Sequence, residues 1–131
     1  MPAWNPSIIW PGGFIASVEA RRDEYSLGRA RCWVRPSLPL LRGEPVSTTA
    51  RVMGVVDIAN GLTPLFSPTD VAFPNLDLTA HLLRSPVGEW IGFDISVCSS
   101  AVGIGLTHSI LHDSIGPFAA VSKTLTVRPN I

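Results

Sequence analysis

The sequence predicts an α+β domain in which an antiparallel sheet of about six strands wraps around one helix. Only one segment carries a convincing helical pattern of apolar residues. The other apolar segments are short and rich in β-branched and aromatic residues, as strands are. The connections between consecutive strand segments are also short, which is typical of hairpins and therefore of an antiparallel sheet.

The predicted strands lie on both sides of the helix in the sequence. Residues 1–13, rich in Pro, Gly and Trp, are expected to be an extended lead-in whose Trp side chains dock on the domain or on a partner. Residues 14–131 are expected to form the single domain. The strands are expected at Phe14–Tyr25, Gly28–Val34, Val71–Arg84, Glu89–Ser99, Ile104–His112 and Phe118–Arg128.

The one helix is expected over Ser47–Asn60. Ser47 or Thr48 can cap its first turn, and the Asn60-Gly61 pair is a stop signal. Gly54 inside the helix costs roughly 1 kcal/mol relative to Ala, which suggests a close approach to the sheet. One helix cannot cover both faces of a six-stranded sheet, so we expect a homodimer.

Composition excludes several classes of function. Ten basic residues balance ten acidic residues, so the chain lacks the positive charge that nucleic acid or an anionic membrane surface attracts. Six Arg in residues 1–45 could meet an anionic partner such as a CoA phosphate, although a solvated strand face explains them as well. No apolar run is long enough to span a membrane and no signal peptide is visible, so we expect a cytoplasmic protein.

Cysteine and histidine give no metal site. Cys32 and Cys98 lie in apolar strand segments and are expected to be buried thiols. His108 and His112 are four residues apart on a strand, too far to share a metal ion. No cofactor motif is present, because the glycine pair Gly103 and Gly105 lacks the rest of a nucleotide-binding fingerprint.

Two charged residues stand out in apolar strands. Asp77 follows Pro74-Asn75 among apolar residues, where a carboxylate either orients a water molecule as general base or is simply solvated. Lys123 shares a strand face with Ala119, Val121, Leu125 and Val127. It is expected to extend to the edge of the core, or to pair with a buried carboxylate such as Asp77. The helix N-terminus could also stabilise a thioester oxyanion or a phosphate.

Three stretches together resemble a known family. They are RCWVRPSLPLLRGEP with the following TTARVMGVVDIANG, then NLDLTAHLLRSPVGEW, then GIGLTHSILHDSIGPFAAVSKTLTVRP. In order and spacing they are similar to the C-terminal half of double-hotdog, thioesterase II-type acyl-CoA thioesterases, over about residues 14–129. The resemblance implies a hotdog fold and hydrolysis of an acyl-CoA thioester to a free acid and CoA, without a cofactor or a metal.

The resemblance also implies site residues. Asp77 matches the family's water-positioning Asp, and Lys123 takes the place of its Gln. Ser99 or Ser100 lies in the strand that supplies the hydroxyl partner, although neither lies in a G-x-S-x-G elbow. Asn60, Gly61 and Thr79 are expected to bind the substrate.

Two departures from the family leave alternatives open. A protonated Lys only donates hydrogen bonds, whereas Gln also accepts them. The family's first hotdog half is missing from this chain. The alternatives to a hydrolase are therefore a non-catalytic acyl or CoA binding module, and a structural partner subunit for another hotdog chain.

Overall fold

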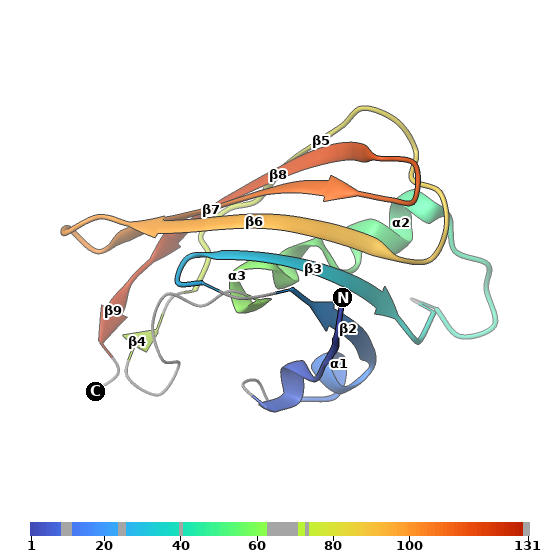
Figure 1. Cartoon of the computed structure of the whole chain (residues 1–131), viewed down its shortest axis with the longest axis horizontal. Helices are drawn as coiled ribbons and strands as arrows, with labels where there is room; N and C mark the ends of the chain where they lie inside the picture. Colours follow the sequence, from blue (N-terminus) through green and yellow to red (C-terminus); the bar gives the residue numbers. More distant parts are fainter. Residues whose placement is uncertain (9–11, 24–25, 40, 63–70, 73, 130–131) are drawn as a thin grey trace.

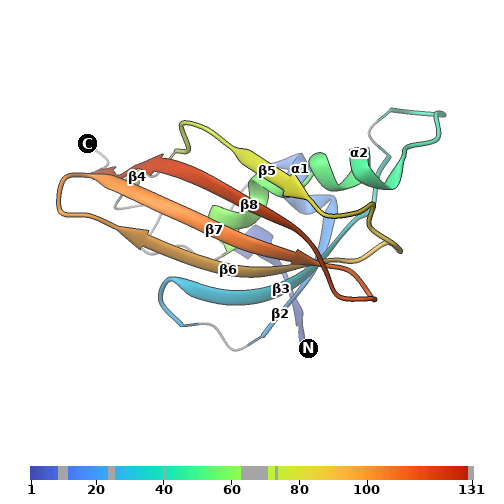
Figure 2. The same ribbon diagram turned by 90° about the horizontal axis from the view of Figure 1, so that it is seen from above.

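The computed structural model describes residues 1–8, 12–23, 26–39, 41–62, 71–72 and 74–129. Its main feature is a seven-stranded antiparallel sheet with the strand order β1-β2-β3-β6-β7-β8-β5, and β4 and β9 form a separate pair. The short helical segments lie along one face of the sheet (Figure 1 and Figure 2). This arrangement confirms the predicted α+β hotdog fold.

The short connections predicted hairpins, and the structure confirms them for β2–β3, β6–β7 and β7–β8. The hairpin expected across the short connection after Arg84 is wrong, because β5 pairs with β8 and β6 pairs with β3. The strands are β1 (Ala3–Trp4), β2 (Val18–Arg22), β3 (Arg29–Pro36), β5 (Thr79–Leu82), β6 (Ile91–Ser99), β7 (Ile104–His112) and β8 (Pro117–Thr126), and the separate pair is β4 (Val71–Ala72) with β9 (Arg128–Pro129). The lead-in supplies β1, a single turn η1 (Pro6–Ile8) follows it, and the Arg22 guanidinium lies 3.9 Å from the centre of the Trp4 ring. Trp4 therefore docks on the domain.

Two predicted strands are shorter in the structure. The strand expected over Phe14–Tyr25 begins only at Val18, because Gly13–Ala16 form the helical turn α1. The strand expected over Val71–Arg84 is divided into β4 and β5. Pro74 lies between the two pieces, and proline cannot donate a hydrogen bond to a ladder.

The predicted helix is interrupted. It consists of α2 (Thr48–Met53), η2 (Val56–Ile58) and α3 (Ala59–Leu62). The Ser47 hydroxyl accepts a hydrogen bond from the Ala50 N–H at 3.1 Å, which confirms the predicted cap. Gly54 ends α2, and glycine favours the unfolded chain more than Ala does.

The core lies between these helical segments and the concave face of the sheet. Val52, Val55, Ile58 and Leu62 pack against inward side chains of β3 and β6, such as Val34 and Phe93. Each fully buried aliphatic or aromatic side chain of this kind contributes about 1.5–3 kcal/mol. Because successive side chains of a strand point to opposite faces, the strand residues between the core residues lie on the outer face of the sheet.

The two cysteines differ in burial. Cys32 is buried, as predicted, and burial raises the pKa of its thiol to about 12. Cys98 is exposed, so its predicted burial is wrong. Odd-numbered residues of β6 such as Ile95 point to the core, and an even-numbered residue on the same strand points away from it.

Within the described ranges, no helix has the length and apolarity needed to cross a membrane.

Candidate functional site

A β-bulge precedes β5 at the edge of the sheet. Asn75 bridges to Leu125, and Thr79 pairs with Ser122. Three residues (76–78) therefore lie opposite two residues (123–124), which leaves one extra residue on the edge strand. Bulges of this kind redirect side chains and are common beside active sites.

Asp77 is the central residue of this bulge. Its Oδ1 atom accepts a hydrogen bond from the Thr124 N–H at 2.7 Å, so the carboxylate replaces the backbone acceptor that the bulge removes from the ladder. The side chain is exposed, and within the described part of the chain no group donates to Oδ2. One oxygen is thus fixed to the sheet, and the other is available to a water molecule.

Lys123 does not meet Asp77, so the pairing between them that the sequence left open is not made. Its Nζ donates to the backbone oxygen of Asp57 at 2.6 Å and to Asp57 Oδ1 at 3.3 Å. The pleat of β8 directs the Lys123 side chain inward, where it is 1% exposed, whereas Asp77 reaches the Thr124 N–H from the sheet edge. Burial lowers the pKa of Lys123, and Asp57 partly opposes this shift.

Two hydroxyls near Lys123 were missed by the sequence reasoning. Thr107 pairs directly with Lys123 across β7 and β8, and Ser109 follows two residues later on the same inner face. Both are buried, and neither hydroxyl has a hydrogen-bond partner in the described ranges. Their even spacing with Leu111 on β7 is the sequence signal that could have placed them in the core.

The predicted serine partners lie away from Asp77. Ser99 ends β6, and Ser100 forms the β6–β7 hairpin, where its N–H donates to Ile104 O at 2.7 Å. Three strand spacings, roughly 14 Å, separate β6 from the bulge. The structure therefore does not bring either serine to Asp77 within one chain.

The predicted substrate-binding residues fall in two places. Thr79 begins β5, two residues after Asp77, and is exposed. Asn60 and Gly61 lie in α3, and the burial of these two residues is outside what the structure describes. Among the described residues there is no cluster of His, Cys, Asp or Glu that could hold a metal ion.

The arginines of the first hairpin are largely engaged. Arg31 pairs with Asp23 at 2.7 Å, and Arg29 with Asp94 at 3.6 Å. Arg35 pairs with Glu19 and with Glu89, and its guanidinium also lies over the Trp90 ring. These contacts agree with a solvated strand face more than with a phosphate site.

A second carboxylate, Asp113, holds two turns together. Its side chain is 0% exposed and forms a bidentate ion pair with Arg84, at 2.6 and 2.8 Å. It also accepts from the N–H groups of Val87, Ile115 and Gly116. The Arg84 hydrogen bonds, followed by those from the backbone, hold the pKa of Asp113 well below its usual range. Its hydrogen-bonding capacity is fully used.

Comparison with known proteins agrees with the fold described above. A family model described as the acyl-CoA thioesterase C-terminal domain matches residues 2–127. Comparison with curated proteins gives no match.

Among solved structures, the chain is similar to the acyl-CoA thioesterase II TesB2 from Mycobacterium marinum, with a TM-score of 0.64 and 22% identity over 99% of this chain and 56% of that chain. A tesB protein from Mycobacterium avium subs paratuberculosis gives 0.62 and 20% over 86% and 48%. A thioesterase family protein from Silicibacter pomeroyi gives 0.61 and 18% over 85% of each chain. The chain thus spans about half the length of the two mycobacterial proteins, and these identities establish the shared fold.

Proposed function

This chain belongs to the family of acyl-CoA thioesterase C-terminal domains, and from that premise we propose that it hydrolyses an acyl-CoA thioester with a water molecule positioned by Asp77. The single observation that carries this proposal is the Asp77 carboxylate at the bulge, which has one oxygen hydrogen-bonded to the sheet and one oxygen open to solvent. Oδ1 is held by the Thr124 N–H, and Oδ2 faces solvent at an exposed edge.

The proposed chemistry needs one base and one water. Asp77 Oδ2 accepts a proton from the water, and the water oxygen attacks the thioester carbonyl carbon. The carbon–sulfur bond then breaks, and the CoA sulfur leaves as a thiolate that takes up a proton. The products are a free carboxylic acid and CoA. The fixed Oδ1 holds the carboxylate in one orientation, so Oδ2 is preorganised for the water.

We propose further that the free edge of β5 pairs with a second copy of the chain. Among the described residues, β5 has a hydrogen-bonded neighbouring strand on one side only, and such an edge can add another strand. Leu76, Leu82 and Leu83 are exposed beside it. Antiparallel pairing of two β5 strands would cover these leucines and place Asp77 of each copy near the Leu82 end of the other.

Sedimentation velocity tests the dimer. We expect a homodimer at micromolar concentration and a monomer for Leu82→Asp combined with Leu83→Asp, with Leu27→Asp in the distant β2–β3 turn as the exposed-leucine control. A wild-type chain that stays monomeric would contradict the pairing, and a complex only with another hotdog chain would indicate a structural partner subunit.

Release of free thiol from a panel of short to long acyl-CoA substrates tests the hydrolase. We expect turnover by the wild-type chain and a loss of about 10²–10⁴-fold in kcat for Asp77→Ala, the usual contribution of a general base. No thiol release from any substrate, together with an Asp77→Ala variant identical to wild type, would refute the proposal. The physiological acyl chain would come from the same panel.

One observation favours a second candidate, a non-catalytic acyl or CoA binding module. Lys123 occupies the place where the family resemblance implies Gln, and it is bound to Asp57 and directed away from Asp77. A binding module would bind acyl-CoA without releasing thiol. For the hydrolase, Lys123→Gln changes kcat little.

We also propose a cytoplasmic location. Cys32 and Cys98 are both free thiols, which suits a reducing compartment. Cell fractionation with a tagged chain tests this, and recovery outside the cytoplasm would contradict it.

A further inference from the structure

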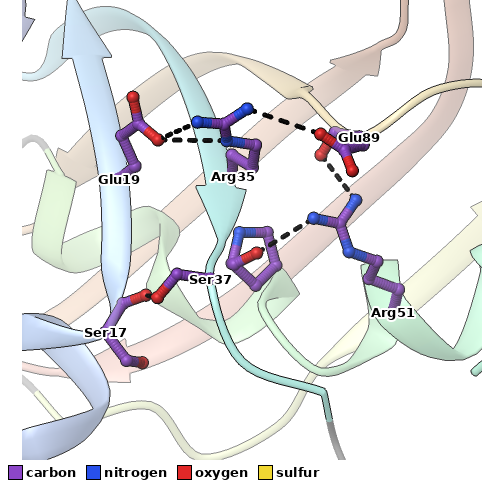
Figure 3. A network of polar contacts seen from close by, with 7 residues as sticks. Ser17, Glu19, Arg35, Ser37, Arg51 and Glu89 are labelled. Atoms are coloured by element: carbon purple, nitrogen blue, oxygen red, sulfur yellow. Dashed lines mark hydrogen bonds and ion pairs between the residues drawn. The ribbon is translucent and has the colours of Figure 1, made fainter.

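A cleft of about 810 Å³ opens at the end of the sheet opposite the bulge. It is bounded by α1, by the residues after β3, by the connection into α2 and by the turn before β6. Its volume lies within the range of about 300–1,000 Å³ that is usual for small-molecule sites. Figure 3 shows the polar side chains beside it.

Arg51 of α2 is the cation of this cleft. Its guanidinium donates to the backbone oxygens of Glu89, at 2.7 Å, and of Pro36, at 3.0 Å. These two bonds fix its orientation, as Figure 3 shows, but both acceptors are neutral. A guanidinium has five N–H donors, so the two bonds leave donors unused.

The two acidic residues that line the cleft, Glu89 and Glu44, do not neutralise Arg51. The Glu89 carboxylate is turned to Arg35, at 3.4 Å, and Arg35 also binds Glu19 (Figure 3). Within the described residues, no carboxylate lies within ion-pair distance of Arg51. Glu44, the other acid of the cleft, is exposed on the loop before α2, where solvent screens its charge.

The rest of the lining is mainly apolar. Phe14 is 51% exposed and Leu38 is 67% exposed, and both face the cleft together with Val46 and Val55. Large apolar side chains gathered around one fixed cation match a ligand that has a hydrocarbon body and an acceptor oxygen at its end. An Arg pairs most strongly with a carboxylate, through two parallel hydrogen bonds.

We propose that this cleft binds a free aliphatic carboxylic acid, with the carboxylate on Arg51 and the chain against Phe14 and Leu38. The site is separate from Asp77 within one chain. Glu89 precedes β6, whereas the Asp77 contact at Thr124 aligns with Cys98 near the other end of that strand. Seven strand residues, roughly 23 Å, separate Ile91 from Cys98. The inference therefore does not depend on the proposed hydrolysis, although its ligand class includes the acid that hydrolysis would release.

Calorimetric titration of the full chain with hexanoate, octanoate and decanoate below their micelle concentrations tests the proposal. We expect saturable binding at one site, with Kd falling roughly fourfold for each methylene added, the value for burial of one CH₂ group. Decanamide serves as the neutral comparison. It should bind at least tenfold more weakly than decanoate, and equal binding would show that Arg51 does not recognise the charge and would overturn the carboxylate assignment.

Two variants locate the binding. Arg51→Gln removes the charge, and Leu38→Asp places a repelling carboxylate on an exposed position of the cleft, where the fold is not at risk. Both should weaken decanoate binding at least tenfold, whereas Leu27→Asp, an equally exposed leucine at the far end of β3, should not. Unchanged binding by Leu38→Asp, or no saturable binding by the wild-type chain, would overturn the proposal. Asp77→Asn should keep decanoate binding whatever its effect on hydrolysis.

Discussion

Two carboxylates of this chain, Asp77 and Asp113, both accept backbone hydrogen bonds but differ in burial and in the number of those bonds. Asp113 is fully buried, and its two oxygens accept hydrogen bonds from Arg84 and three backbone N–H groups. Asp77 is exposed and, within the part of the chain that the structure describes, accepts one hydrogen bond, from the Thr124 N–H. Both oxygens of the Asp113 carboxylate accept hydrogen bonds, whereas only one oxygen of the Asp77 carboxylate does so within the described residues.

The difference separates structure from chemistry. A buried carboxylate with every lone pair engaged stabilises the fold, because removing it leaves donors without partners. It has no capacity left for a water molecule. A carboxylate with one oxygen anchored and one oxygen open contributes little to folding, but it can accept a proton. Asp113 therefore holds the two turns in place, and Asp77 is the residue that we propose for the reaction.

The largest expected effect is the loss of Asp113. Asp113→Asn turns an amide toward Arg84 or toward the backbone N–H groups, so part of a buried ion pair is broken. We expect the free energy of unfolding to fall by roughly 3–5 kcal/mol. Urea denaturation measures this change, and a loss below about 1 kcal/mol would show that the two turns do not depend on the ion pair.

The same residue predicts an acid dependence. The pKa of Asp113 is lower in the folded chain than the unfolded value of about 3.9. Its stabilisation is therefore complete above that unfolded value and is lost as the pH falls toward the folded pKa. The stability of wild type and of Asp113→Asn should converge below pH 4, and a constant difference between the two from pH 7 to pH 3 would contradict this account.

A smaller effect is expected at Lys123. Burial lowers the pKa of Lys123 in the folded chain. Above that folded pKa the unfolded chain binds more protons than the folded chain, so the contribution of Lys123 to stability improves as the pH rises toward about 10.4. Lys123→Met should stabilise the chain at pH 7, on the order of 1–3 kcal/mol, because Asp57 is 69% exposed and stays solvated. The advantage should shrink by pH 10. The contribution of Cys32 to stability falls as the pH rises above about 8.5, because burial raises its pKa. Wild type and Lys123→Met share this contribution, so it cancels in the difference between their free energies of unfolding.

The smallest effect is expected at Thr107. Its buried hydroxyl has no partner in the described part of the chain, and Val has nearly the same shape without the hydroxyl. Thr107→Val should raise the free energy of unfolding by about 1 kcal/mol. Ser122→Ala, which removes a hydroxyl bonded to His108 on the outer face, should not raise it. Differential scanning calorimetry compares the two, and a destabilised Thr107→Val would reveal a partner for the hydroxyl.

Much of the fold follows from local patterns. The β6–β7 and β7–β8 hairpins and the Ser47 cap depend on residues close in sequence, and the structure confirms them. The bulge does not follow in this way, because it depends on the register between Asn75–Thr79 and β8, which are distant in sequence. A shift of one residue exchanges the two faces of a strand.

The site was less predictable for the same reason. Sequence alternation placed Lys123 on an apolar face, and its burial agrees with that. Its partner, Asp57, comes from the helical segment packed against the sheet. The sequence does not indicate Asp57 as this partner, because no local spacing connects it to β8. The contact between Lys123 and Asp57 depends on how η2 packs against the sheet, which only the three-dimensional structure shows.

The most direct test of the central claim applies Asn substitution to both carboxylates and measures two quantities for each, kcat/KM for acyl-CoA hydrolysis and the free energy of unfolding. Asp77→Asn keeps the Oδ1 acceptor, so it should lower kcat/KM at least 100-fold and change stability by no more than about 0.5 kcal/mol. Asp113→Asn should lose stability as stated above and, at a temperature where it is folded, retain kcat/KM within about tenfold. An Asp77→Asn variant as active as wild type would contradict the assignment of the reaction to Asp77.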